Sequence, residues 1–398
     1  MKVCFVGLST LPLPPVKGGA VERTIQETAR HLAEKGVEVH IISIWDDLIN
    51  DQVLEENKFA VFHHVRIPRL FLKYPVNQLA KGLFYFGEAG KLVNEIHPDI
   101  VHYSNYPAAV YVAARQYKKR YPNIINFHNM DYGWNFFAKR LDRFLFGKGF
   151  NRSDFFIAVS DYIKDHVLRK YEKFVNGRIV TVHNGVNIEI FRPREKKSLR
   201  QKIGLEENDP VLIFAGRIDP RKGIDTLLDA FSQAKRRINN LKLIIIGPMG
   251  SFWHEKPQEF SLHIQRRIES MRDVRLLQPE YDKEKLAEIY SMADIACLPS
   301  EFPEGFPLTA LEMQACGVPV IATDAGGMKE AYLDGYTGFY VRQKDAADLS
   351  EKIEKLVLNA QLRQEMSANA RKWVEENFSW KIIADKLIGI YQQVSHHG

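Results

Sequence analysis

The stretch that most constrains the fold is residues 298–327, LPSEFPEGFPLTALEMQACGVPVIATDAGG. The apolar residues 295–298 stop at a Pro-Ser pair, which predicts the end of a buried strand. Apolar residues then recur at helical spacing after Pro307, a residue suited to the first helical position, until Gly317 and Pro319 predict the helix end. Strand, loop, helix, short strand and glycine turn follow one another as in an α/β sheet.

Two glutamates, Glu304 and Glu312, flank the start of this predicted helix at a spacing of eight positions. The first N–H groups of a helix, here around Leu308 and Thr309, have no partner inside it and form a site suited to a diphosphate. A carboxylate one to two turns further in could accept hydrogen bonds from a ribose diol. The alternative is an ordinary solvated helix that carries two carboxylates at this spacing by chance.

The length of 398 residues is too great for one ordinary core and predicts two α/β domains. We expect an N-terminal domain over residues 1–192, a second domain over 193–378, and a final helical segment over 379–398. No apolar stretch approaches the roughly 20 residues of a membrane span. The N-terminal apolar run is interpreted as a first strand, not a signal peptide.

Composition excludes several classes of function. The net charge of +6 is modest, and the basic residues interleave with carboxylates, so we expect no nucleic-acid partner. The three cysteines, Cys4, Cys297 and Cys316, are too far apart in sequence for a disulfide framework or a metal knuckle. We therefore expect a cytoplasmic protein in a reducing compartment.

The N-terminal half begins with a strand, a glycine loop, a helix and a second strand, which together predict a βαβ unit. The loop reads KGGAVER and contains Gly18 and Gly19. Their spacing excludes a strict G-x-G-x-x-G dinucleotide fingerprint, but they fall at the carboxyl edge of the predicted sheet, where ligands bind in open α/β folds. An ordinary loop before a helix is the alternative interpretation.

Two further features of this half concern function. His128 directly follows a predicted strand over 124–127, so it falls at the ligand edge of the sheet, although a histidine there is often only a loop residue. The segment 134–152 mixes aromatic and basic residues. It is either an amphipathic surface for an anionic membrane or a helix that packs its aromatic face inward.

The C-terminal half carries a basic loop, GRIDPRKG, after a predicted strand over 211–215. Arg217 and Lys222 in this loop would neutralise the charge of a bound diphosphate. A plain basic loop is the alternative. A later strand ends at Gly247, in the turn GPMG.

These motifs strongly resemble those of the retaining family-four glycosyltransferases. The matching runs are KGGAVER, HPDIVHYS, HNGVN, GRIDPRKG and EGFPLTALEMQACGVPVIAT. The resemblance spans essentially the whole chain and is weakest over residues 45–153. It implies the GT-B fold, in which two Rossmann-like domains face each other across a cleft and a C-terminal helix crosses back to the first domain.

The resemblance also implies a role for each candidate residue in transferring a sugar, with retention, from a nucleoside-diphosphate sugar to a glycan, lipid or small-molecule acceptor. Glu304 and His128 would contact the donor sugar as catalytic residues, and whether Glu304 acts as a nucleophile or only positions the sugar stays open. Glu312 would bind the ribose and Gly247 the base. The diphosphate would lie on Arg217, Lys222, Gly18, Gly19, Leu308 and Thr309. No cofactor and no metal are expected, since the sequence has no Asp-x-Asp motif that could hold one.

Other functions remain open from the sequence. A GT-B epimerase or hydrolase would use the same donor site, and a sugar phosphorylase would need a pyridoxal phosphate lysine that nothing here marks. A non-catalytic descendant could serve as a cell-envelope or coat assembly component. Peripheral contact with the inner face of an anionic membrane also stays open.

Overall fold

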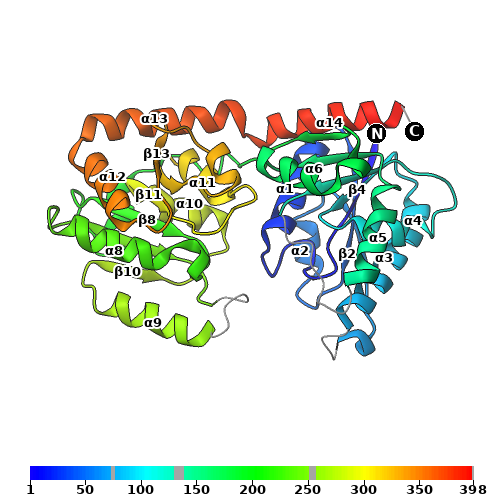
Figure 1. Ribbon diagram of the computed structural model, residues 1–398, viewed down its shortest axis with the longest axis horizontal. Helices are drawn as coiled ribbons and strands as arrows, with labels where there is room; N and C mark the ends of the chain where they lie inside the picture. The colour runs from blue at the N-terminus through cyan, green and yellow to red at the C-terminus, as the bar shows by residue number, and fades with distance from the viewer. Residues whose placement is uncertain (73–76, 130–138, 251–256, 397–398) are drawn as a thin grey trace. The chain divides into compact units, whose positions relative to one another are not determined.

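The computed structural model describes residues 1–72, 77–129, 139–250 and 257–396. The chain forms two compact units (Figure 1). Unit 1 comprises residues 1–184 together with 380–398, and unit 2 comprises residues 185–379. Each unit is an α/β sandwich around one parallel sheet, so the predicted fold class of two Rossmann-like domains is confirmed.

The described part of unit 1 contains a seven-stranded parallel sheet in the order β3-β2-β1-β4-β5-β6-β7. Its central strands are mostly apolar and almost entirely buried, as expected when helices cover both faces of a parallel sheet. The strand order reverses between β1 and β4. The strands are β1 (Lys2–Val6), β2 (Glu38–Ile44), β3 (Val61–Val65), β4 (Ile100–Ser104), β5 (Asn123–Phe127), β6 (Phe155–Ala158) and β7 (Ile179–Thr181).

Helices lie between successive strands of unit 1, and the final helix of the chain, α14, adds to them. Their bounds are α1 (Ala20–Glu34), α2 (Asp51–Glu55), η1 (Arg69–Leu72), α3 (Asn77–Ile96), α4 (Pro107–Ala114), α5 (Lys139–Phe150), α6 (Asp161–Val175) and α14 (Trp380–His396). The C-terminal helix α14 packs against α1, and Ile383 and Leu387 share one apolar core with Ile25 and Leu32. The last helix of the chain thus belongs to the unit that contains the N-terminus (Figure 1).

Unit 2 contains, among its described residues, a six-stranded parallel sheet in the order β10-β9-β8-β11-β12-β13. This is the Rossmann order, with the reversal between β8 and β11. The strands are β8 (Val211–Ala215), β9 (Lys242–Ile246), β10 (Val274–Leu277), β11 (Ile295–Leu298), β12 (Val320–Thr323) and β13 (Gly338–Val341).

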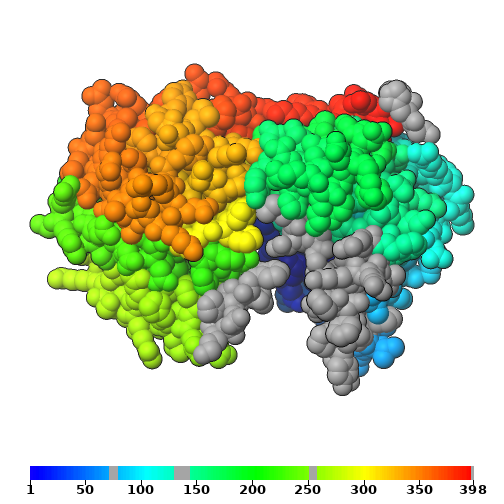
Figure 2. Space-filling model, in the orientation of Figure 1, coloured from blue at the N-terminus to red at the C-terminus, as the bar shows by residue number. Residues whose placement is uncertain are grey.

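The helices of unit 2 bury their apolar faces on both sides of this sheet, and α12 and α13 form part of the outer surface in Figure 2, in orange. Several begin at a side-chain cap; for example, Asp282 accepts from the N–H of Lys285 at 2.9 Å. The bounds are α7 (Lys196–Lys202), η3 (Pro220–Lys222), α8 (Ile224–Lys235), α9 (Pro257–Glu269), α10 (Lys283–Ser291), α11 (Leu308–Ala315), η4 (Gly327–Glu330), α12 (Ala346–Leu358) and α13 (Ala360–Asn377).

Helix α5 contains residues 139–150 of the aromatic and basic segment, and residues 134–138 lie outside the described residues. Phe146 and Phe150 are buried, whereas the side chain of Phe144 is 55% exposed. This arrangement favours the inward-packing interpretation for α5, and contact with a membrane stays a prediction. Among the residues that the structure describes, no helix combines the length and the apolar character needed to cross a bilayer.

Candidate functional site

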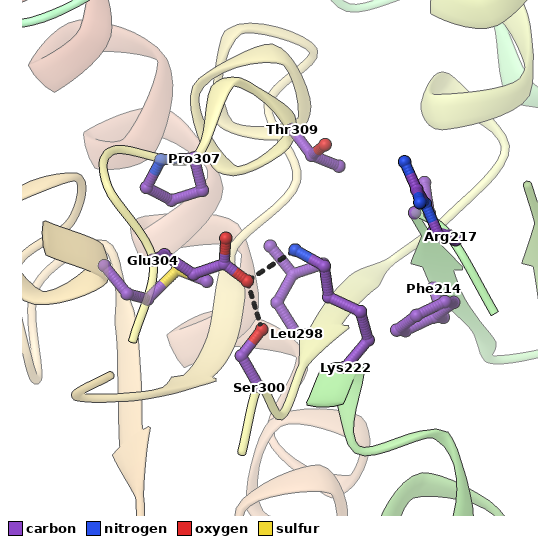
Figure 3. A pocket seen from close by; sticks show the side chains of 11 residues that line it. Phe214, Arg217, Lys222, Leu298, Ser300, Glu304, Pro307 and Thr309 are labelled. Carbon is purple, nitrogen blue, oxygen red and sulfur yellow. Dashed lines mark hydrogen bonds and ion pairs between the residues drawn. The ribbon is translucent and has the colours of Figure 1, made fainter. Parts of the chain in front are cut away.

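A pocket of about 260 Å³ lies in unit 2 at the carboxyl ends of β8 and β11, the point where the strand order reverses. Open α/β sheets bind their ligands at such a switch point, because the helices that follow the two strands leave on opposite faces and open a crevice. The lining residues are Phe214, Ala215, Gly216, Arg217, Lys222, Leu298, Ser300, Glu304, Pro307, Thr309 and Met328 (Figure 3).

Lys222, Ser300 and Glu304 converge in this pocket (Figure 3). The ammonium of Lys222 lies 2.5 Å from Oε1 of Glu304. The hydroxyl of Ser300 donates to the same oxygen at 2.7 Å. Both charged side chains keep some exposure, 33% for Lys222 and 19% for Glu304, so a ligand that enters the pocket can exchange for either partner.

Backbone contacts hold Glu304 in place. Its N–H donates to the carbonyl of Ala325 at 3.1 Å, and its carbonyl accepts from the N–H of Gly327 at 2.8 Å. The hydroxyl of Thr323, the last residue of β12, donates to the carbonyl of Ser300 at 2.6 Å. The glycine turn after β12 therefore fixes the loop that presents Glu304.

The basic loop after β8 approaches the backbone of the loop after β11 very closely. Gly223 has φ of 69°, and a Cβ at this position would lie 1.9 Å from the carbonyl oxygen of Pro299. The N–H of Glu301 donates to the carbonyl of Arg221 at 2.8 Å and joins the same two loops. Only glycine combines this φ with this contact, and so Gly223 brings Lys222 within reach of Glu304.

Arg217 and Arg221 differ in position although both belong to the basic loop. Arg217 lines the pocket, and in the view of Figure 3 Lys222 lies between Arg217 and Glu304. Arg221 is not among the lining residues; its guanidinium is held by the buried carboxylate of Asp219 at 3.1 and 3.2 Å. The pocket thus receives two cations from this loop, Arg217 and Lys222.

Helix α11 begins at the edge of the pocket. Pro307 has φ of −81° and ψ of 111° and is the N-cap, so the expectation that it is the first helical residue is wrong by one position. Leu308 is the first helical residue, and Pro307 and Thr309 line the pocket. The unpaired N–H groups of the first turn give this end of the helix a partial positive charge.

Glu312 and Gly247 are not among the pocket-lining residues. Glu312 lies one turn further along α11, where its Oε2 is 3.4 Å from the hydroxyl of Tyr290. Gly247 follows β9 with φ of 145°, and a Cβ there would lie 1.9 Å from the carbonyl oxygen of Gly216. Gly247 therefore allows close packing directly beside the loop of Arg217.

The candidate residues of the N-terminal half belong to unit 1. Gly18 and Gly19 have φ of 75° and 104°, and Gly19 is the N-cap of α1. A Cβ on Gly19 would lie 2.1 Å from Oε2 of Glu22, a carboxylate whose burial raises its pKa to about 7. Gly19 thus makes room for a buried carboxyl group at the carboxyl edge of the sheet.

His128 is the first residue after β5. Its N–H donates to Oδ1 of Asn105 at 2.6 Å, and its ring Nε2 is buried without a hydrogen-bond partner among the described residues. Burial lowers the pKa of His128 to about 4. The imidazole is therefore neutral at pH 7 and can donate from one nitrogen while it accepts at the other.

Sequence reasoning missed Ser300 and Met328 as pocket residues, although their positions carried a signal. Ser300 directly follows the strand β11, at the carboxyl edge of the sheet, and Met328 directly follows the glycine turn after β12.

The pocket as a whole suits an anionic ligand that also carries hydroxyl groups. Arg217, Lys222 and the start of α11 supply positive charge, and the carboxylate of Glu304 beside them accepts hydrogen bonds from hydroxyls. In the described part of the chain, no group of three or more His, Cys, Asp or Glu side chains is arranged to hold a metal ion.

Two family models match the chain. The model described as glycosyl transferases group 1 matches residues 195–373, and the model described as glycosyltransferase family 4 matches residues 18–190. The first match contains every residue that lines the pocket, and the second contains the glycine pair and His128.

Three relatives indicate how far the similarity extends. A D-inositol 3-phosphate glycosyltransferase of Stackebrandtia nassauensis is 29% identical over 98% of this chain and 91% of its own length. Another of Saccharomonospora viridis is 32% identical over 61% of this chain, but the match spans only 56% of that relative. Spore coat protein SA of Bacillus subtilis is 23% identical over 99% of this chain and 100% of its own length.

Solved structures share the fold. Sucrose-phosphate synthase from Thermosynechococcus elongatus superposes with a TM-score of 0.81 at 23% identity, and the match covers 100% of both chains. HepE from Anabaena, solved in complex with UDP-glucose, superposes with a TM-score of 0.75 at 20% identity over 99% of this chain and 100% of that one. With one family model on each unit, the chain belongs to the group 1, family 4 glycosyltransferases of the GT-B fold.

Proposed function

We propose that this protein transfers a hexose from a nucleoside-diphosphate sugar to a hydroxyl acceptor, with retention at the anomeric carbon and without a divalent metal. The observation that carries the proposal is the ion pair inside the pocket, in which the ammonium of Lys222 lies 2.5 Å from Oε1 of Glu304. Arg217 and the start of α11 line the same pocket. A diphosphate needs the cations, and the attached sugar needs the carboxylate.

In this proposal the ion pair between Lys222 and Glu304 opens when the donor binds. Lys222 turns to the diphosphate together with Arg217 and the N–H groups around Leu308 and Thr309. Glu304 is then available to the sugar hydroxyls. Two cations and a helix terminus neutralise the charge that develops on the leaving group, which is the task that a divalent metal performs in other transferases.

The bond changes balance without a covalent enzyme intermediate. The acceptor oxygen forms a bond to the anomeric carbon on the face from which the phosphate departs, and the glycosyl–phosphate bond breaks. The acceptor proton moves to the departing phosphate oxygen. His128 contacts the donor sugar as a neutral imidazole, Gly18 and Gly19 let the backbone approach the phosphate, Glu312 accepts from the ribose hydroxyls, and Gly247 lies beside the base.

The relatives suggest which substrates to try first. The Anabaena structure contains UDP-glucose, and this supports a uridine diphosphate hexose as the first donor. The relatives from Stackebrandtia nassauensis and Saccharomonospora viridis are named for D-inositol 3-phosphate, which is therefore the first acceptor to test. Glycan and lipid acceptors follow.

The test is a transfer assay with UDP-glucose and a panel of acceptors in the presence of EDTA, with the anomeric configuration of the product read by NMR. A product joined to the acceptor with the configuration of the donor supports the proposal. A product with inverted configuration contradicts retention. Activity that EDTA abolishes contradicts metal independence. A free sugar or an epimerised nucleotide sugar as the only product would point instead to a hydrolase or an epimerase.

A non-catalytic assembly role is the second candidate, because spore coat protein SA matches this chain over its whole length. A chain released from catalysis would be expected to lose the charges of its pocket. Arg217, Lys222 and Glu304 all line the pocket, and the pairing of Lys222 with Glu304 is intact. These observations favour the enzyme.

A further inference from the structure

Two neighbouring strands of unit 1 end side by side at one edge of the sheet. Strands β4 and β5 pair in parallel, with Ser104 opposite Asn126. Asn105 is the first residue after β4, and His128 is the first residue after β5. Both lie at the carboxyl edge of the sheet, the edge at which ligands bind in this class of fold.

The hydrogen bonds of the ladder continue one residue beyond β4. The N–H of Asn105 donates to the carbonyl of Asn126 at 2.8 Å. In a regular parallel ladder the next bond would run from the N–H of His128 to the main-chain carbonyl of Asn105. The structure instead has the N–H of His128 donate to the side-chain Oδ1 of Asn105 at 2.6 Å. The amide side chain thus takes the place of a main-chain carbonyl.

The backbone of Asn105 explains why its side chain replaces its main-chain carbonyl as the acceptor. Its φ is 58°, in the left-handed region, so the chain turns away from the sheet at this residue and enters α4 two residues later. The main-chain carbonyl turns with it and leaves the ladder. Among the side chains that adopt this conformation with little strain, only Asn and Asp also offer an acceptor at this reach. Asn105 is only 8% exposed. The N–H of His128 that it accepts from would therefore be costly to leave unpaired.

The side chain of His128 points to a function for this arrangement. Its Nε2 is buried and has no hydrogen-bond partner among the described residues, so this nitrogen lacks the partner that buried polar atoms normally have. Phe127, the residue before it, is buried, and its carbonyl accepts from the N–H of Val159 at 3.1 Å. The strand therefore fixes the backbone before His128, and Asn105 fixes the N–H of His128 itself.

We propose that Asn105 is a positioning residue for His128: its left-handed backbone ends β4, and its side-chain carbonyl holds the N–H of His128 so that the imidazole faces the donor sugar in a fixed orientation. The inference deepens the proposed function, since it rests on the contact of His128 with the sugar. It predicts that the acceptor oxygen at position 105 matters more than the identity of the residue.

Three variants separate the parts of this proposal. Asn105→Gly keeps the left-handed conformation and removes the acceptor, and Asn105→Asp keeps both. Asn176→Gly is the matched control: Asn176 also has a positive φ, 44°, but it caps the C-terminus of α6. Urea unfolding establishes that each variant is folded.

The first readout is hydrogen exchange of the His128 amide, which needs no ligand. We expect the wild type, Asn105→Asp and Asn176→Gly to protect this amide, and Asn105→Gly to exchange it at least about tenfold faster, the factor that the loss of one hydrogen bond gives. Equal exchange in the wild type and Asn105→Gly overturns the inference. So does a wild-type amide that exchanges as fast as an unprotected loop, a result that requires no variant.

The second readout is turnover of UDP-glucose, compared with His128→Gln. We expect Asn105→Gly to lower kcat by about tenfold, Asn105→Asp to restore most of it, and His128→Gln to lower it more. If His128→Gln leaves turnover unchanged, the proposed role of His128 fails. If His128→Gln slows turnover and Asn105→Gly does not, the positioning role of Asn105 fails while the proposed function stands.

Discussion

The ammonium of Lys222 lies 2.5 Å from Oε1 of Glu304, although 82 positions separate the two residues in the chain. Lys222 ends η3 after β8, and Glu304 belongs to the loop after β11, so the pair spans the point where the strand order of unit 2 reverses. Because each partner satisfies the other, removing one changes what the other can bind. Loss of the Lys222 charge should therefore weaken nucleotide binding, whereas loss of the Glu304 charge should leave it unchanged or strengthen it.

Replacing Lys222 by methionine should weaken the binding of a nucleoside diphosphate by about a hundredfold, because the diphosphate loses a charge-assisted contact and Glu304 is left unpaired beside it. Titration calorimetry with UDP measures the change. Arg221→Met is the matched control, since Arg221 is the neighbouring cation but is held by Asp219 outside the pocket lining. An equal loss in both variants would show that only the net charge of the loop matters.

Replacing Glu304 by glutamine should leave the affinity for UDP unchanged or raise it, because Lys222 is released from its ion pair. Transfer should nevertheless slow by about a hundredfold, since the charged acceptor for the sugar hydroxyls is lost. Calorimetry and a transfer assay on the same preparation separate the two effects. Weaker UDP binding in Glu304→Gln would mean that Glu304 serves the nucleotide rather than the sugar.

Glu312→Ala should weaken UDP binding by about tenfold or more through the loss of the ribose hydrogen bonds. Tyr290→Phe removes the hydroxyl that lies 3.4 Å from Glu312 and should have a smaller effect. Calorimetry with UDP and with pyrophosphate, which has no ribose, checks the assignment: Glu312→Ala should affect UDP alone. A parallel loss for pyrophosphate would remove Glu312 from the ribose site.

Gly223→Ala should destabilise the protein by about 3 kcal/mol, because the new methyl group adds strain at positive φ and a clash with the carbonyl of Pro299. Gly335→Ala is the control within unit 2. Gly335 has a similar φ of 71°, but a Cβ there meets nothing within 4 Å, so only the backbone strain of about 1 kcal/mol applies. Urea unfolding measures both, and equal losses would refute the close contact between the two loops.

His128 should make stability depend on pH. Burial lowers its pKa to about 4, below the value of about 6.5 in the unfolded chain. Unfolding therefore takes up a proton between these values, so the contribution is complete above pH 6.5 and is lost as the pH falls to about 4, by at most about 3 kcal/mol.

The measurement is urea unfolding of the wild type and His128→Gln at pH 7 and pH 4.5. The comparison is made between the two proteins at each pH, since His102, with its pKa lowered to about 3 by burial, titrates in the same direction and Glu22 in the opposite one. The stability of the wild type relative to His128→Gln should fall on acidification. A constant difference would mean that the imidazole is not buried.

The sequence was sufficient to predict most of the fold of unit 2. The apolar runs at 211–215 and 295–298 predict β8 and β11 at their observed bounds, because buried parallel strands are continuous runs of apolar residues. The pocket charges followed from the motif. Ser300 did not, since its role depends on the direction of the Glu304 side chain, which no pattern in the sequence specifies.

Prediction was poorest over residues 45–153 of unit 1, where the strand β3 and the helices α3 and α4 were not foreseen. Glycines in helices usually indicate breaks, but Gly90 lies where a Cβ would be 2.2 Å from the carbonyl oxygen of Ala113, so it allows α3 to pack on α4. Gly149 likewise allows α5 to pack on α4, since a Cβ there would lie 1.8 Å from the carbonyl oxygen of Pro107. The contact of Asn105 with His128 likewise depends on the register of two strands.

The most direct test of the account is thermal unfolding of the purified protein with a panel of nucleoside diphosphates and their sugars, with and without EDTA. A ligand that binds the native state raises the melting temperature by mass action. We predict a clear rise with the diphosphate of one base, unaffected by EDTA and lost in Lys222→Met. No rise with any nucleotide would contradict the transferase and favour an assembly role for the chain.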